Sequence, residues 1–320
     1  MARLAGPLKL VVGIALLYFA LRDVQVEAFL EAIGQLDLGW LALVLGLILA
    51  GLMLKTWRWA LLLSPVVPGI AFRDVLGVLL VGQAGNILLP LRGGDVLRSW
   101  LGSSSDVSRL PSVIATVMIE KGLDAVILAL AMALAFPLLP SNLGLGAEMK
   151  GLLGLGLGVL AAAIIVLVLS PPLWLRLRKI LDRLPSTLSR HSLQLGDRFT
   201  QGMVELRKSG AFIMVGGLTV LSWLATYGTN QALILSFRIG APPSAGLLVL
   251  VLVFIGIIPG LMPGQVGPFY FFAKLALSQF GVDPSASTAY AVLLHALFLV
   301  PPLAGAGIYV MGRGKSFRAR

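Results

Sequence analysis

Residues Asn86–Arg98 read N-I-L-L-P-L-R-G-G-D-V-L-R and end an apolar run before it has comfortably crossed a bilayer. That run, Val75 to Leu91, is at the short limit of the roughly 17–25 residues that a spanning helix needs. Pro90 removes a backbone donor, and Gly93-Gly94 favour a turn. Irregular backbone at membrane depth is tolerated only where it is buried in protein or lines a water-filled cavity. We therefore predict a re-entrant hairpin, a segment that enters the membrane and returns to the same side.

A second stretch has the same character. Residues Ile258 to Tyr270 read I-P-G-L-M-P-G-Q-V-G-P-F-Y, with three prolines and three glycines inside an otherwise apolar region. Two broken hydrophobic segments at corresponding places in two halves of a chain are the best sequence-level indication of a transporter's binding site. We predict a second re-entrant hairpin here, between Ser244 and about Phe280.

The composition is that of an integral membrane protein. Apolar residues make up 58% of the 320 residues and charged residues 12%, against about a quarter charged in soluble domains. The net charge of +11 does not indicate nucleic-acid binding, because no such motif is present and the basic residues flank hydrophobic runs. With no cysteine and two histidines, the chain cannot form a zinc site of the usual type, and we expect no metal or cofactor.

Hydrophobic runs predict six spanning helices, at about 7–21, 40–63, 111–136, 151–169, 211–237 and 287–311. The first run lacks a cleavage site and is interpreted as a membrane helix. The long polar segment 173–208 alternates leucines and basic residues at helical spacing, which is typical of an amphipathic helix on an anionic cytoplasmic leaflet.

The end of the second span carries two tryptophans and two basic residues. Trp57 and Trp59 are expected at the headgroup level, where the side chains of Lys55 and Arg58 would also snorkel.

The basic residues indicate the orientation. If both termini are cytoplasmic and each broken segment returns to its own side, most of the 25 basic residues lie on the cytoplasmic side. The unit of span, hairpin and span then occurs twice, at 40–136 and 211–312, in opposite orientations. The predicted fold is therefore a single all-α, multi-pass domain of a cell membrane, residues 1–320, with two re-entrant hairpins in an inverted-topology repeat.

Charged residues at the mouth of the first hairpin are candidates for binding a lipid phosphate. Arg92 and Arg98 flank Asp95, and an arginine fork matches phosphate geometry while staying charged in any environment. The alternative, equally open, is a cytoplasmic anchor with a local Asp–Arg pair.

Three charges fall near the middle of the third span. Glu120 lies nine residues beyond Pro111, about 14 Å along a helix, and shares a helix face with Asp124, while Lys121 lies within reach of Asp124. Charges at this depth indicate a functional site by default. The alternative is a structural ion pair that holds the helix to its neighbours.

Polar residues of the second half complete the set. Gln265 is the polar tip of the second hairpin, and Lys274 beyond it would offer a cation to a headgroup or snorkel outward. His295 in the last span would relay protons with Glu120 or Asp124, or make a helix–helix hydrogen bond.

Three motifs together resemble the lysylphosphatidylglycerol synthase transmembrane-region family, the flippase-like domain shared by the multiple peptide resistance factor and archaeal dolichol-linked glycosylation proteins. They are N-x-x-x-P-x-R-x-G-D-x-x-R from Asn86 to Arg98, E-K-x-x-D at Glu120–Asp124, and P-G-x-x-G at Pro263–Gly267. The resemblance implies translocation of a lipid or lipid-linked headgroup. The chain departs from it at Tyr270, where members often carry an acidic residue, and at His295, where they often carry arginine.

The resulting hypothesis is a transporter, not an enzyme, that moves an anionic phospholipid or polyprenyl-linked lipid between leaflets. No Walker A loop is present, so movement would be downhill or coupled to protons. A lipid-modifying transferase within the membrane and a non-transporting lipid-binding subunit of an envelope-assembly complex remain as alternatives. The candidate substrate-binding residues are Asn86, Arg92, Asp95, Arg98, Glu120, Lys121, Asp124, Gln265, Tyr270, Lys274 and His295.

Overall fold

The described part of the chain is entirely helices and short connections. The computed structural model describes residues 2–89, 93–103, 106–135, 155–156, 158–159, 197, 211–258 and 263–317. An all-α fold is thus confirmed over these residues. The predicted fourth span and the amphipathic segment 173–208 lie outside them, apart from isolated positions.

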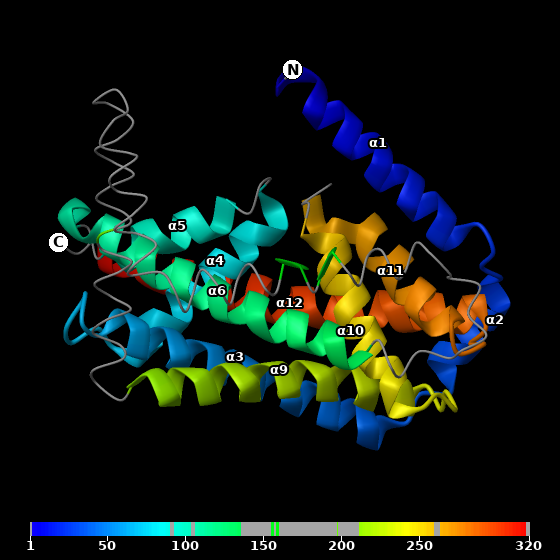
Figure 1. Ribbon diagram of the computed structural model, residues 1–320. Coiled ribbons are helices and arrows are strands. Elements are labelled where there is room, and N and C mark those ends of the chain that lie inside the picture. The colour runs from blue at the N-terminus through cyan, green and yellow to red at the C-terminus, as the bar shows by residue number, and fades with distance from the viewer. Residues whose placement is uncertain are drawn as a thin grey trace.

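The order of a long helix, two short helices and a long helix occurs twice (Figure 1). After α1 (Ala2–Leu21) and α2 (Val26–Gly34), the first set comprises α3 (Leu38–Leu63), α4 (Phe72–Leu88), α5 (Gly93–Gly102), the 3-10 turn η2 (Val107–Arg109) and α6 (Leu110–Ala135). The second comprises α9 (Ala211–Ser236), α10 (Pro243–Ile257), the 3-10 turn η4 (Pro263–Gln265), α11 (Val266–Ser278) and α12 (Pro284–Phe317).

Three of the described helices are long and apolar enough to cross a membrane: α3, α9 and the Pro284–Gly312 part of α12. Helix α6 is also 26 residues long, but it carries the charges Glu120, Lys121 and Asp124.

Helices α4 and α5 form an antiparallel pair in which glycines allow close contact. Gly82 of α4 lies against Arg98 of α5, and Gly85 lies against Gly94. At Gly94, a Cβ atom would overlap the carbonyl oxygen of Gly82, so no larger residue fits without separating the helices. Helix α4 ends where Leu89 adopts extended backbone angles (φ −96°, ψ 143°), directly before Pro90.

Helices α10 and α11 form the second pair. Its turn contains two residues with left-handed backbone, Gly264 (φ 67°) and Gln265 (φ 56°). Helix α10 is apolar on all sides and lies at the centre of the core, where residues 248 to 253 are all buried. The turn η4 packs against α4, so the tip of the second pair touches the first.

The antiparallel helices α3 and α9 run side by side along the lower edge of the view in Figure 1. Gly51 of α3 faces Ala225 of α9, and the side chain of Ser236 donates to the Asp37 carbonyl oxygen (2.9 Å). Small residues permit such close helix contacts in membranes. One helix of each short pair packs on it, α4 on α3 and α10 on α9.

Candidate functional site

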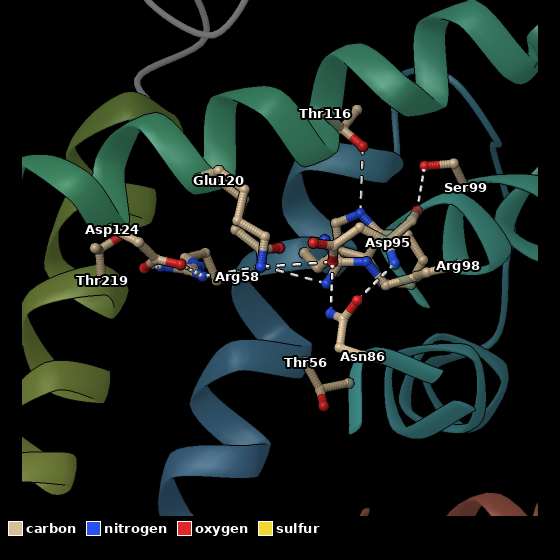
Figure 2. Close-up of polar contacts among 12 residues, drawn as sticks. Thr56, Arg58, Asn86, Asp95, Arg98, Ser99, Thr116, Glu120, Asp124 and Thr219 are labelled. Atoms are coloured by element: carbon tan, nitrogen blue, oxygen red, sulfur yellow. Dashed lines mark hydrogen bonds and ion pairs between the residues drawn. The ribbon is translucent and has the colours of Figure 1, made fainter. Parts of the chain in front are cut away.

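An ion-pair network joins α3, α5 and α6, and hydrogen bonds connect it to α9 (Figure 2). Arg58 of α3 donates from Nη1 to Oδ1 of Asp124 (2.7 Å), and its Nη2 lies 3.2 Å from Oε1 of Glu120, both acids on α6. Arg98 of α5 donates to the same Glu120 oxygen (3.2 Å). Trp223 of α9 donates from Nε1 to Asp124 (3.0 Å). The two carboxylates predicted from the α6 sequence are therefore held by two arginines that come from other helices.

The expected headgroup position of Arg58 and Trp59 was wrong. The Arg58 side chain is 1% exposed, and Trp59 is fully buried, with Nε1 donating to Thr116 (3.2 Å) and its ring 4.6 Å from the Arg98 guanidinium. Of the two tryptophans, only Trp57 is exposed, at 49%. A buried carboxylate is costly without a partner, so pairing with α6 outweighs snorkelling.

A second cluster connects the tip of α4 to α5 and α6. Asn86 donates from Nδ2 to Oδ1 of Asp95 (3.1 Å), and its Oδ1 accepts from the Asp95 amide (3.1 Å). Asp95 also pairs with Lys121 (3.5 Å). The local Asp95–Arg98 pair considered from the sequence does not form, because each residue pairs with α6 instead. Arg92 lies outside the described residues.

A cavity of about 260 Å³ lies between the tips of the two helix pairs. Asn86 comes from the first tip, and Gly264 and Gln265 come from the second. The long helices α3 and α9 contribute Lys55 and Asn230. An adjoining cavity of about 170 Å³ is lined by the ion network. The two cavities share the residues Lys55, Gln83, Asn86, Thr226 and Phe254.

His295 and Tyr270 lie together at the second tip. His295 is 3% exposed, and its ring stacks on Phe269 with 4.4 Å between centroids, while Tyr270 meets it edge-on at 5.3 Å. His295 lines the 260 Å³ cavity, whereas Glu120 and Asp124 line the adjoining one, and no contact joins it to either acid among the described residues.

Lys274 faces away from both cavities. Its Nζ donates to the carbonyl oxygen of Ala20 in α1 (3.0 Å) and lies 3.6 Å from Asp23. Close by, Gly267 of α11 packs against the Gly13 carbonyl. Lys274 thus connects α11 to α1.

The structure brings most of the predicted residues to the two cavities and adds three whose place there the sequence did not predict. Lys55, Arg58 and Gln83 line one or both cavities. The sequence did contain a signal for Lys55 and Arg58. Buried acids such as Glu120 and Asp124 need cations as partners, and these two are among the few basic residues inside the predicted spans. A signal for Gln83 was its spacing three residues before Asn86, on the same helix face.

Metal binding has no support in the described part of the chain, where no group of three His, Asp or Glu side chains could hold an ion. The acids contact arginine and lysine instead. The arrangement is suited to holding polar or charged groups of a ligand away from hydrocarbon.

One family model matches this chain over residues 7–306, and its description is lysylphosphatidylglycerol synthase TM region. The match includes both short-helix pairs and the whole ion network. It confirms the resemblance inferred from the three motifs. A comparison with curated proteins gave no match.

Proposed function

Because the chain belongs to the lysylphosphatidylglycerol synthase TM region family, a family of membrane proteins with lipid-related function, we propose that it moves a lipid headgroup between the leaflets. The observation that carries this proposal is a cavity of about 260 Å³ that is lined by the tips of both short-helix pairs and has polar side chains in a mainly apolar wall. A transported headgroup would pass through this cavity while its acyl chains remain in the lipid.

The cavity would lower the main free-energy barrier to lipid translocation. Moving a charged or polar headgroup into hydrocarbon is costly, because its hydration is lost without replacement. Here Lys55, Asn86 and Gln265 supply polar groups at the cavity wall, between apolar residues such as Phe254 and Phe269. These side chains would replace water during passage.

Helix lengths support placing both pairs as re-entrant hairpins. Helix α5 has 10 residues, which rise roughly 15 Å, about half of a 30 Å hydrocarbon core. Helix α11 has 13 residues. Short helices of this kind reach the middle of a membrane and return, and the two tips meet there.

An inverted repeat is supported by the spacing of the elements. Helices begin at 38, 72, 93 and 110 in the first set and at 211, 243, 266 and 284 in the second, a nearly constant offset. The helix contacts follow the same correspondence. Helix α4 packs on α12, and its counterpart α10 packs on α6, which is the counterpart of α12. In the same way, α5 packs on α6 and its counterpart α11 packs on α12. The corresponding helices α3 and α9 are antiparallel, so the two sets have opposite orientations in the membrane. Such repeats enclose a site that opens alternately to each side.

We place the protein in a cell membrane with both termini on the cytoplasmic side. The first hairpin then enters from the cytoplasm and the second from outside. This follows the bias of the basic residues. The proposal is a transporter and not a transferase.

A quenching assay in liposomes tests the function. Purified protein is reconstituted with a lipid that carries a fluorescent headgroup, and an impermeant reductant is added outside. Protein-free liposomes should lose about half of the signal, and liposomes with the protein nearly all of it. Retention of half of the signal with folded wild-type protein would refute translocation, and product formation from a labelled donor would favour the transferase.

A matched pair of variants connects the result to the cavity. Thr226 is 7% exposed and lines both cavities, so Thr226→Trp should block the path. Val220, also on α9, is 43% exposed on the outer surface, so Val220→Trp should retain transport.

A further inference from the structure

The charges around the two cavities do not balance. The lining contains the three acids Asp95, Glu120 and Asp124 and the four cations Lys55, Arg58, Arg98 and Lys121. Two arginines pair with the α6 acids, and Lys121 pairs with Asp95. One positive charge remains unmatched among the described lining residues.

The unmatched charge is that of Lys55. No ion pair or hydrogen bond of its ammonium group occurs within the described part of the chain, although it lies one helical turn before Arg58. Lys55 lines both cavities and a third, smaller one of about 40 Å³ between α3 and α9. It therefore occupies the junction of the three cavities, together with Gln83 and Thr226.

Further unpartnered groups lie in the adjoining cavity. Arg98 is 3% exposed, yet its Nε and Nη2 have no hydrogen-bond partner, and Oε2 of Glu120 has none either. Buried polar groups without partners cost free energy unless a ligand or water satisfies them. The cavity thus offers donors for an anion and an acceptor for a hydroxyl group.

We infer that Lys55 binds the headgroup phosphate of the transported lipid, and that this headgroup is a phosphodiester with one net negative charge and a hydroxyl group. The inference rests on the proposed function. An anion stabilises the Lys55 ammonium group, which has no ion-pair partner among the described residues, and a ligand with one negative charge brings the net charge of the cavity lining and ligand to zero. Arg98 supplies further donors to the phosphate, and Oε2 of Glu120 accepts from the hydroxyl. A headgroup with an added amine would bring positive charge to a cavity that already has an excess.

The test compares phosphatidylglycerol with phosphatidylcholine, both labelled, in liposomes containing the full-length protein. Wild-type protein should move phosphatidylglycerol faster. Lys55→Gln should slow it about tenfold, the effect of losing a charge-assisted hydrogen bond, and should slow phosphatidylcholine less, because its choline group already adds positive charge to the cavity. Lys55→Arg should retain most of the rate. The control Arg109→Gln removes an exposed positive charge, paired with Asp106 at 2.9 Å, and should change neither rate.

Binding of phosphatidylglycerol to the detergent-solubilised protein separates this inference from the proposed function. If wild-type protein moves no lipid but binds phosphatidylglycerol in a Lys55-dependent way, the function fails and the inference stands. If the protein moves lipid but Lys55→Gln moves phosphatidylglycerol as fast as wild type, the function stands and the inference fails.

Two further outcomes would overturn the inference. One is a wild-type preference for phosphatidylcholine. The other is displacement of phosphatidylglycerol by equimolar soluble glycerol phosphate, which would assign the site to a free anion. If Lys55→Gln does not fold, the transport rate of Lys55→Arg and the headgroup preference of the wild-type protein test the inference.

Discussion

Replacing Arg58 by methionine is expected to destabilise the protein by about 3–5 kcal/mol, the range for breaking a buried ion pair from one side. Arg58 is 1% exposed and contacts both Asp124 (2.7 Å) and Glu120 (3.2 Å). Methionine fills a similar volume, so the loss comes from the two carboxylates that remain without this cation. Thermal unfolding of the purified protein in detergent measures the effect.

A double variant provides the control. Arg58→Met combined with Asp124→Asn removes one positive and one negative charge and leaves the Arg98–Glu120 pair intact. This variant should recover most of the lost stability, because neither position 120 nor position 124 then carries a carboxylate without a cation. An unfolding midpoint of Arg58→Met equal to that of wild type would show that the network does not stabilise the fold.

The Gly94→Ala substitution is expected to separate α4 from α5. The added methyl group would overlap the Gly82 carbonyl oxygen and the Asn86 amide nitrogen, which are backbone atoms and cannot rotate away. Overpacking typically costs about 1–3 kcal/mol, and we expect the upper end or more here. Loss of the Asn86–Asp95 hydrogen bonds should accompany it, together with a clear fall in the unfolding midpoint.

The neighbouring Gly93→Ala is the matched control. Its new methyl group would lie 3.2 Å from Cβ of Leu89, a residue that is 44% exposed, so a shift of a few tenths of an ångström relieves the contact. We expect a small change in the unfolding midpoint. Equal effects of the two substitutions would contradict the assigned contact between Gly94 and α4.

Local sequence signals predicted the elements well. Pro90 and Gly93-Gly94 predicted the break between α4 and α5, and Gly264 in the second turn adopts the positive φ that glycine favours. These features depend on backbone chemistry within a few residues. The long apolar runs likewise predicted α3, α6, α9 and α12 to within a few residues at most termini.

Partners across helices could not be predicted in the same way. Trp57 and Trp59 are two residues apart, roughly 200° around a helix, so they cannot both face lipid. The sequence reasoning placed both at the headgroup level, whereas Trp59 turns inward with Arg58. Similarly, Lys274 was expected to offer a cation to a headgroup or to snorkel outward, but α1 packs against α11 and the Lys274 ammonium donates to the Ala20 carbonyl oxygen. Such contacts depend on which helices pack together, a property of the whole fold.

The central claim is that the tips of the two helix pairs reach the cavity from opposite sides of the membrane. The chain has no cysteine, so single cysteines introduced as Leu89→Cys and Gln265→Cys can be labelled selectively with an impermeant thiol reagent in sealed, oriented membranes. We predict that the first reacts only from the cytoplasmic side and the second only from the exterior. Reaction of both cysteines from the same side would contradict the account.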